Sequence, residues 1–232
     1  MSDQKKWVKD YPDALVDFST RYDKEISGGK KDPTLLAIFA TGGGMSLSNL
    51  AEVPGASRRL ALTHHPYSQK DTIRFLNHNG IIADEITWDY CSAASSVLYR
   101  EALISMCDHQ PYLYVAVTAA LTTTRWRRGK NRAYVAISRL ANKPEIWEIS
   151  LAKNSEAGYE ALFKNDDDSI DLESLTLQRR SEDQKISRAV LAIILEDRTF
   201  ANLNDGESIS TVEVLSNGKT SVSKSLWLEG EG

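Results

Sequence analysis

Thr41-Gly42-Gly43-Gly44 is the segment whose residue types and spacing most suggest chemistry. It follows the apolar run Leu35–Ala40 and precedes a stretch of helical character that ends near Ala51. Glycines let a backbone approach a ligand closely, and the free N–H groups at the start of a helix attract anions. The Gly-Lys-Ser/Thr ending of a P-loop is missing. Taken alone, three glycines are more often a tight turn than a site for an anion.

A second candidate is the basic segment Arg125–Arg132, which holds five cations and a tryptophan in eight residues. Arginine side chains fork onto phosphate oxygens, and an indole ring can stack on a base. The segment is therefore either a solvated loop that happens to be basic or a contact for a phosphate or nucleic acid. The arginines expected to contact a ligand are Arg125, Arg127 and Arg128.

The remaining polar clusters favour structural interpretations. His64 and His65 are neighbours, and neighbours on a strand point to opposite faces, so they do not form a two-ligand clamp. Asp166-Asp167-Asp168 lacks the spacing of a calcium loop and is expected in a solvated loop. Cys91 and Cys107, placed by the pattern on one long helix, are too far apart for a disulfide and lack partners spaced for zinc. We predict no metal site and no cofactor.

The segment 35–67 resembles the C-terminal domain of the competence/damage-inducible CinA proteins, a family of nicotinamide mononucleotide amidohydrolases. The family pattern is a strand ending in A-E-S-C-T-G-G, a helix, V-P-G, a second strand and A-Y-S-N-x-x-K. Val53-Pro54-Gly55 and Tyr67-Ser68 fall at the family's spacing from the glycines, and Thr118 matches the Thr of the family's T-G-I-A-G-P loop. The resemblance covers roughly residues 8–197. It implies an α/β/α fold and, often, homodimers.

Three departures from the family pattern affect the chemistry. Ala40 stands where the family has its nucleophilic Ser, Phe39 replaces the preceding Glu, and Thr72 replaces the activating Lys. Alanine cannot attack a carbonyl, and threonine is no base at neutral pH. We therefore expect that amidohydrolase activity is lost while a cleft for a nucleotide-like anion remains, for regulation or assembly. The residues expected around that ligand are Thr41, Gly42, Gly43, Gly44, Tyr67, Ser68, Thr118, Arg125, Arg127 and Arg128.

Two other functions stay open. The first is an active amidohydrolase-type enzyme with a relocated nucleophile, drawn from Thr41, Ser46 or Ser48 beside the two histidines. The second is a nucleic-acid or phosphoprotein binder that acts through residues 125–132. The chain carries 28 Lys and Arg against 32 Asp and Glu, a net charge of −4 with a pI near 5.6. This acidic balance disfavours general nucleic-acid binding, although it leaves a local basic site open.

The elements that must position these residues follow from the apolar pattern. Leu35–Ala40 is a continuous apolar run, typical of a strand buried on both faces. The helix predicted over 182–196 has apolar residues at helical spacing and a capping-box signature at Ser181 and Gln184. Asn217-Gly218 predicts a hairpin turn between the last two strands. The other predicted strands are 60–63, 112–118, 133–140 and 145–151; the other predicted helices lie around 14–27, after Tyr67 and from Asp89, and 152–175 is expected to be a loop.

The whole pattern predicts an α/β/α three-layer sandwich with a mixed sheet and a C-terminal β-hairpin extension. Residues 1–198 form the expected CinA-like domain, and 199–232 the extension packed on it, with Trp227 and Leu228 near its end. Composition is that of a globular protein, with 41% apolar and 26% charged residues. Two cysteines, no signal-peptide core and no apolar run of roughly 20 residues indicate a cytoplasmic protein without a membrane span. A homodimer is expected.

Overall fold

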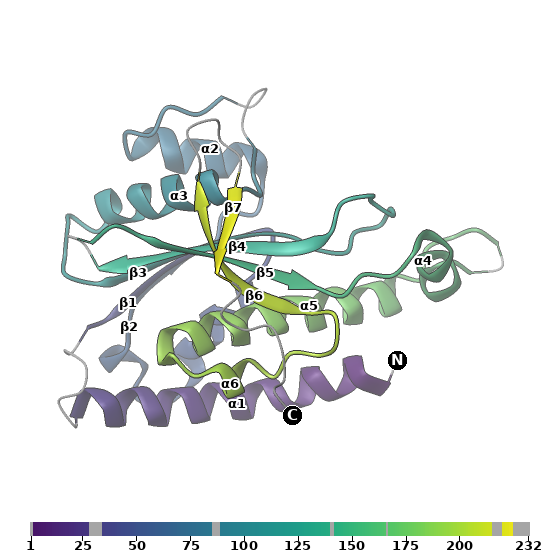
Figure 1. The fold of residues 1–232 in the computed structure, drawn as a ribbon, viewed down its shortest axis with the longest axis horizontal. Coiled ribbons are helices and arrows are strands. Elements are labelled where there is room, and N and C mark those ends of the chain that lie inside the picture. The colour runs from purple at the N-terminus through teal and green to yellow at the C-terminus, as the bar shows by residue number, and fades with distance from the viewer. Residues whose placement is uncertain are drawn as a thin grey trace.

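One mixed sheet of seven strands forms the centre of the molecule (Figure 1). The structure, a computed structural model, describes residues 2–27, 34–84, 89–139, 142–165, 167–214 and 220–224. The strand order is β2-β1-β3-β4-β5-β6-β7, with β1 parallel to β2 and β3 and every later pairing antiparallel. The strands are β1 Leu36–Thr41, β2 Leu60–His64, β3 Leu113–Ala120, β4 Asn131–Arg139, β5 Glu145–Leu151, β6 Ser208–Val214 and β7 Thr220–Lys224.

Helices cover both faces of the sheet, which confirms the predicted three-layer arrangement with a mixed sheet. The long helices α1 (Ser2–Ser27) and α5 (Leu172–Leu195) lie on one face, and α2 (Gln69–His78) and α3 (Ala93–Met106) lie on the other (Figure 1). Shorter elements complete the chain: the 3₁₀ helices η1 (Met45–Glu52) and η2 (Ala56–Arg58) and the α-helices α4 (Glu156–Phe163) and α6 (Arg198–Ala201).

The strand β1 shows why a continuous apolar run was required. All six of its residues are buried. Leu36 and Ile38 belong to the core under α1 and α5, whereas Ala37 and Phe39 belong to the core under α2 and α3. Because successive strand residues point to opposite faces and both faces are covered, residues 36–40 are all apolar, and only Thr41 at the end of β1 is polar.

The start of α5 differs from the prediction. The helix begins at Leu172, and the side chain of Asp171 accepts hydrogen bonds from the amides of Glu173 and Ser174. The capping box at Ser181 and Gln184 is therefore wrong, because both residues lie buried inside the helix. The expected loop 152–175 is also wrong, since it contains α4 and the first turn of α5.

One further local prediction is confirmed and one needs correction. The helical stretch predicted after the glycines is present as the 3₁₀ helix η1. The helix α3 begins at Ala93, because the side chain of Ser92 accepts a hydrogen bond from the amide of Ser95. Cys91 and Cys107 therefore flank α3 at its two ends and do not lie within it.

The C-terminal strands extend the main sheet. β6 pairs with β5, and β7 pairs with β6, both antiparallel as a hairpin requires. Asn217-Gly218, Trp227 and Leu228 lie outside the described residues, as does Asp166 of the triple aspartate. Within the described parts of the chain, no helix is long and apolar enough to cross a membrane.

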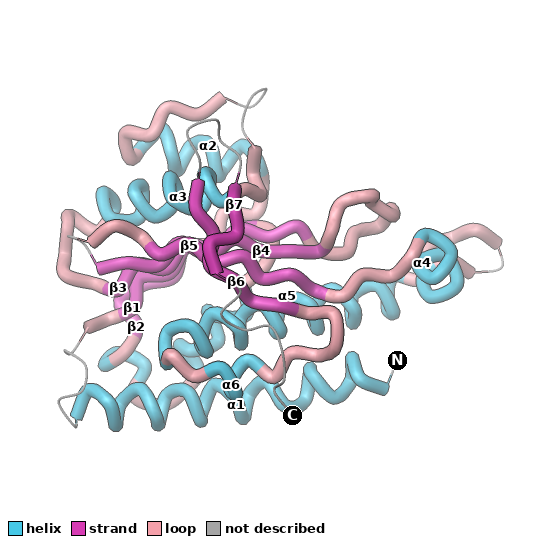
Figure 2. Tube along the Cα trace, viewed as in Figure 1, coloured by secondary structure: helices cyan, strands magenta, loops and turns pink. Residues whose placement is uncertain are grey.

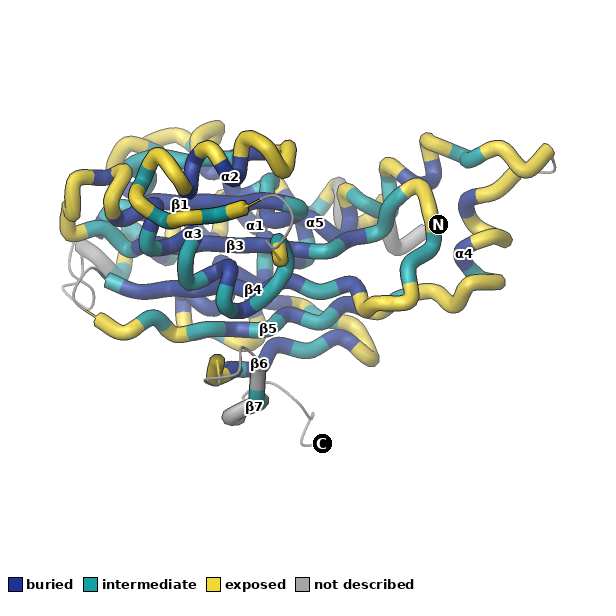
Figure 3. The backbone as a smooth tube through the Cα atoms, turned by 90° about the horizontal axis from the view of Figure 1, so that it is seen from above, coloured by how far each residue is buried: buried dark blue, intermediate teal, exposed yellow. Residues whose placement is uncertain are grey.

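An arm projects beyond one end of the sheet. Figure 2 shows the loop that leads into β4 and the segment that carries α4 extending on the same side, and Figure 3 shows that many residues there are exposed. A small apolar cluster of Tyr159, Phe163 and Leu175, with Trp126 and Ile170 against it, holds the arm together. The arm brings the basic segment 125–132 next to α4.

Candidate functional site

The candidate site lies at the carboxyl ends of β1 and β3, where the chain leaves β1 to form β2 on its other side. Such a switch point is where ligands bind in open α/β sheets. The expected ligand loop Thr41–Gly44 ends β1 here, and Gly42 and Gly44 adopt left-handed φ values of 74° and 78°. The β3 loop that faces it begins after Ala120.

The glycines close this switch point instead of opening it. A Cβ atom at Gly42 would lie 2.1 Å from the carbonyl oxygen of Ala119, and one at Gly43 would lie 2.8 Å from the Cβ of Ala119. A Cβ at Gly44 would meet Val117 at 2.9 Å. The three glycines are required because the loop after β1 packs directly on the end of β3.

The N–H groups at the start of η1 already hold an anion, and it belongs to the chain. The amide of Met45 donates to Oδ1 of Asp183 at 3.0 Å, and the amide of Ser46 donates to Oδ2 at 2.8 Å. The hydroxyl of Ser46 donates to the same carboxylate. Carboxylates and phosphates compete for such amides through the same chemistry, so an external anion at this position has to displace Asp183.

A second carboxylate from α5 holds the loop after β3. Glu182 is 3% exposed and accepts hydrogen bonds from the amide of Thr122 at 2.8 Å and from the side-chain amide of Asn131 at 2.9 Å. Arg179 donates to the carbonyls of Thr122 and Gly42, at 2.8 and 3.2 Å. One polar stretch of α5 therefore fastens both loops that frame the switch point.

The positions of the family's nucleophile and base are part of the core. Ala40 is fully buried, and Phe39 stacks on Phe75 and Tyr99 with ring centroids 4.9 and 4.7 Å apart. Thr72 is fully buried, and its hydroxyl donates to the carbonyl of Ser68 at 3.1 Å. Neither Ala40 nor Thr72 offers a group to a substrate.

Most hydroxyls expected to bind a ligand are used inside the protein. Thr41 donates to the carbonyl of Pro66 at 3.0 Å, and Thr118 donates to the carbonyl of Tyr90. Ser68 caps α2 by accepting from the amide of Asp71 at 3.0 Å. Tyr67 differs, because its side chain is 74% exposed and lies on an open groove that His64 and His65 also line.

The two histidines line the same groove but have different neighbours. His64 packs on Phe75 with ring centroids 4.5 Å apart, and burial lowers its pKa. Burial also lowers the pKa of His65, opposed by smaller contributions from the backbone of Ala40 and the carboxylate of Asp183. Among the described residues, no group of three His, Cys, Asp or Glu side chains could hold a metal ion.

The basic segment is only partly available to a ligand. Arg125, Arg128 and Lys130 are exposed. Arg127, which was expected to contact a ligand as an exposed side chain, is half-buried and donates to the carbonyl of Leu121 at 2.8 Å and to the Asn131 side chain at 3.2 Å. It ties the segment back to the loop that Glu182 holds.

One face of Trp126 is covered by a cation. The ammonium of Lys153 lies 4.8 Å from the centre of the indole ring, and burial together with the positive charge of Arg127 lowers the pKa of Lys153. The cavity beside these residues holds only about 10 Å³, so it admits no more than about one water molecule. It shares no residue with the groove that Tyr67 lines, so Tyr67 and the arginines of the basic segment lie in separate places.

The prediction from sequence missed the three residues that organise this site, Arg179, Glu182 and Asp183. A signal was present, because Glu182 and Asp183 lie four and three residues before Ile186, in phase with the apolar face of α5. Charged residues on the buried face of a helix require partners, which here are the amides of the two loops.

Comparison with known proteins places the fold. No family model matches the sequence, and no curated protein matches it. Two solved structures share the architecture at 10% identity and a TM-score of 0.52: a competence or damage-inducible protein from Enterobacter asburiae and a competence-damaged protein (CinA) superfamily protein from Enterobacter cloacae. Each alignment covers 78% of this chain, and 96% and 90% of the respective structures. The chain therefore has the fold of the CinA-superfamily structures.

Proposed function

We propose that this protein is a CinA-fold binding protein that has lost amide hydrolysis. The observation that carries the proposal is the carboxylate of Asp183 on the amides of Met45 and Ser46, at the switch point where a substrate would have to sit. The packing of Gly42 against Ala119 closes the same place to a ligand.

The chemistry supports this reading. Hydrolysis of an amide needs a nucleophile beside a base, and fixed donors for the oxyanion. Ala40 supplies no nucleophile, and the hydroxyl of Thr72 is buried and bonded to a carbonyl. The amides that could have stabilised an oxyanion are occupied by Asp183.

The ligand we propose is a nucleotide-like or otherwise phosphorylated anion, bound on the outer surface of the basic segment. Arg125, Arg128 and Lys130 present their cations there, and among the described residues the structure gives none of these three side chains an ion pair. Burial and, after it, the positive charge of Arg127 lower the pKa of Lys153, and a phosphate bound nearby would offset the second of these causes. The role is regulation or assembly, in a cytoplasmic homodimer.

Two measurements test this function. An ammonia-release assay on nicotinamide mononucleotide should give no turnover above a blank without protein. Calorimetry with the same nucleotide should show binding that weakens in an Arg125→Ala/Arg128→Ala double variant and stays unchanged in Arg74→Ala, a control cation on α2 that is 66% exposed. Turnover, or the absence of binding at millimolar nucleotide, contradicts the corresponding half of the proposal.

A second candidate function rests on Ser46. Its hydroxyl donates to Asp183, and His65 lies close enough to feel the charge of that carboxylate. Serine, histidine and aspartate are the residue types of a hydrolytic triad. If ammonia release is observed and Ser46→Ala abolishes it, the protein is an enzyme with a relocated nucleophile.

Dimerisation can be checked separately. Light scattering should give twice the chain mass of 25.9 kDa at micromolar concentration. A monomer at every concentration would exclude the homodimer without affecting the proposal on catalysis.

A further inference from the structure

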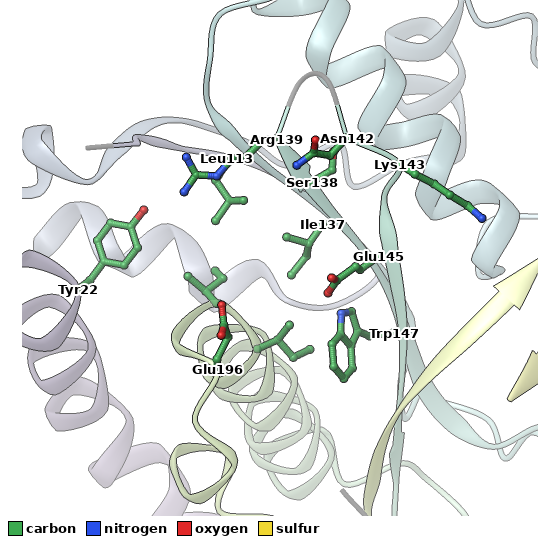
Figure 4. Close-up of a pocket in the computed structure, with 12 residues that line it drawn as sticks. Tyr22, Leu113, Ile137, Ser138, Arg139, Asn142, Lys143, Glu145, Trp147 and Glu196 are labelled. Atoms are coloured by element: carbon green, nitrogen blue, oxygen red, sulfur yellow. The ribbon is translucent and has the colours of Figure 1, made fainter. Parts of the chain in front are cut away.

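A cavity of about 630 Å³ lies at the strand ends opposite to those that carry the glycine loop (Figure 4). Leu113 begins β3, Arg139 ends β4 and Glu145 begins β5, so the three residues lie at the same end of these neighbouring strands. Tyr22 of α1 and the last turn of α5 close the cavity from the side of the helices. Its volume is in the range of sites for small molecules.

The floor of the cavity is apolar and well ordered by packing. It consists of Leu113, Ile137, Trp147, Ile193 and Ile194. Ile137, Trp147 and both isoleucines of α5 are less than one-tenth exposed and belong to the main core. An apolar ring or chain placed on this floor loses water from both surfaces, which stabilises binding in proportion to the area covered.

Two carboxylates and two cations stand around the floor. The carboxylate of Glu145 lies beside Trp147, and that of Glu196 is directed into the cavity from a position between Tyr22 and Trp147 (Figure 4). The guanidinium of Arg139 is turned toward Tyr22, where it donates to the hydroxyl of Thr34 at 3.0 Å. Lys143 points away from the centre of the cavity.

Two more features favour a cation in this place. The C-terminal end of α5 lines the cavity, and the negative end of a helix dipole attracts positive charge. The indole ring of Trp147 is the aromatic side chain with the strongest attraction for cations. The apolar floor, two carboxylates, the helix end and the indole all act on one small volume.

We propose that this cavity binds a small organic amine with an apolar body. Its ammonium group lies beside Glu145 and Glu196, and its apolar body covers Trp147 and the isoleucines of α5. A small organic anion should bind more weakly, since both carboxylates are directed into the cavity while Arg139 and Lys143 are turned away from its centre. The site is independent of the basic segment and of the function proposed above.

The test uses the 2-phenylethylammonium ion as probe, with phenylacetate as a ligand of similar size and opposite charge. Binding is followed by the indole N–H signal of Trp147 in a ¹H–¹⁵N spectrum of the full chain, assigned by its absence in Trp147→Phe. We expect saturation with a Kd of about 1 mM or tighter for the amine and no saturation with phenylacetate.

The variant Glu145→Gln/Glu196→Gln keeps the shape of the rim and removes both charges. It should weaken the amine at least about tenfold, which corresponds to about 1.4 kcal/mol. Lys143→Gln, a rim charge that points away, should leave the affinity within about twofold. Equal binding of phenylacetate, an unchanged affinity in the double variant, or no amine-dependent shift of Trp147 overturns the proposal. A nucleotide titration that fails leaves this result unaffected.

Discussion

The two ends of the parallel strands differ in how tightly they are packed. At the carboxyl ends of β1 and β3, the chain fills the switch point with its own groups, from Ala119 to the carboxylates of Glu182 and Asp183. At the other end of the sheet, beside the amino end of β3, a cavity of about 630 Å³ stays open. The switch point of this sheet is therefore closed by packing, while empty space is present at the opposite strand ends.

The helix α5 explains the difference. Its middle carries Arg179, Glu182 and Asp183, which reach the carboxyl ends of the strands. Its last turn carries Ile193 and Ile194, which cover the core but leave the amino ends partly uncovered. Glu196 then adopts a left-handed φ of 55° and leads the chain away from the sheet.

The largest effect is expected for Gly42→Ala, which tests whether the carboxyl end is tightly closed. The new Cβ would lie 2.1 Å from a backbone oxygen, and the φ of 74° is already unfavourable for alanine. We expect a loss of about 4 kcal/mol in the free energy of unfolding, measured by urea titration.

Two other glycines provide matched controls for that substitution. Gly80 has a φ of 82° and nothing within 4 Å, so Gly80→Ala should cost only about 1 kcal/mol for the backbone strain. Gly129 has neither feature, and Gly129→Ala should change stability by less than about 0.5 kcal/mol. Equal losses at Gly42 and Gly80 would show that the contact with Ala119 carries no weight.

The next effect concerns Asp183→Ala, which reopens the amides of Met45 and Ser46. Unfolding should become easier by about 3 kcal/mol, because buried donors lose a charged acceptor. Sulfate should then stabilise the variant more than the wild type in the same titration, since an anion can take the vacated place. The exposed Asp13→Ala on α1 serves as control. No extra response to sulfate would mean that these amides are no anion site.

The central strands and their burial could be predicted from the sequence, whereas the residues that organise the site could not. Runs such as Leu35–Ala40 and Tyr112–Thr118 must be central strands, because nothing else buries so many apolar residues in a short segment. The role of Asp183 required tertiary information, since its partners are 137 and 138 positions away. The capping box predicted at Ser181 and Gln184 was wrong for the same reason. In the sequence, a polar pair at this spacing looks the same at a helix start as on the buried polar face of a longer helix.

The contact between Arg21 and Asp197 joins α1 to the segment after α5, near the open cavity. The hydrogen bond from Arg21, with further ones from Thr199, lowers the pKa of Asp197 from 3.8 to about 2. Its contribution to stability is therefore complete above the ordinary value and is lost as the pH falls through the lowered one. Asp197→Asn should cost about 1–2 kcal/mol at neutral pH.

The pH dependence distinguishes charge from shape in that variant. Thermal unfolding of the wild type and Asp197→Asn should converge as the pH falls from 3.8 toward about 2. A difference that persists unchanged at the lower pH would assign the effect to the cap that Asp197 provides for Thr199.

The smallest effect on stability is expected for Arg125→Ala/Arg128→Ala, at the surface beyond the closed edge. Both side chains are exposed, so the free energy of unfolding should change by less than about 0.5 kcal/mol. Affinity for a mononucleotide should depend weakly on salt, whereas an oligonucleotide should show a steep dependence that grows with each phosphate bound. A steep dependence that the variant removes would favour the nucleic-acid function.

Because α5 supplies the hydrogen-bond partners for the loops after β1 and β3, the packing at the carboxyl ends of these strands cannot be completed until late in synthesis. A nascent chain that ends before Leu172 contains β1 to β5 but none of Arg179, Glu182 and Asp183. Its amides at Met45, Ser46 and Thr122 are then hydrogen-bonded to water until α5 has been synthesised. Contacts of such sequence separation slow folding. The docking of α5 is thus the step that supplies these amides with their protein partners.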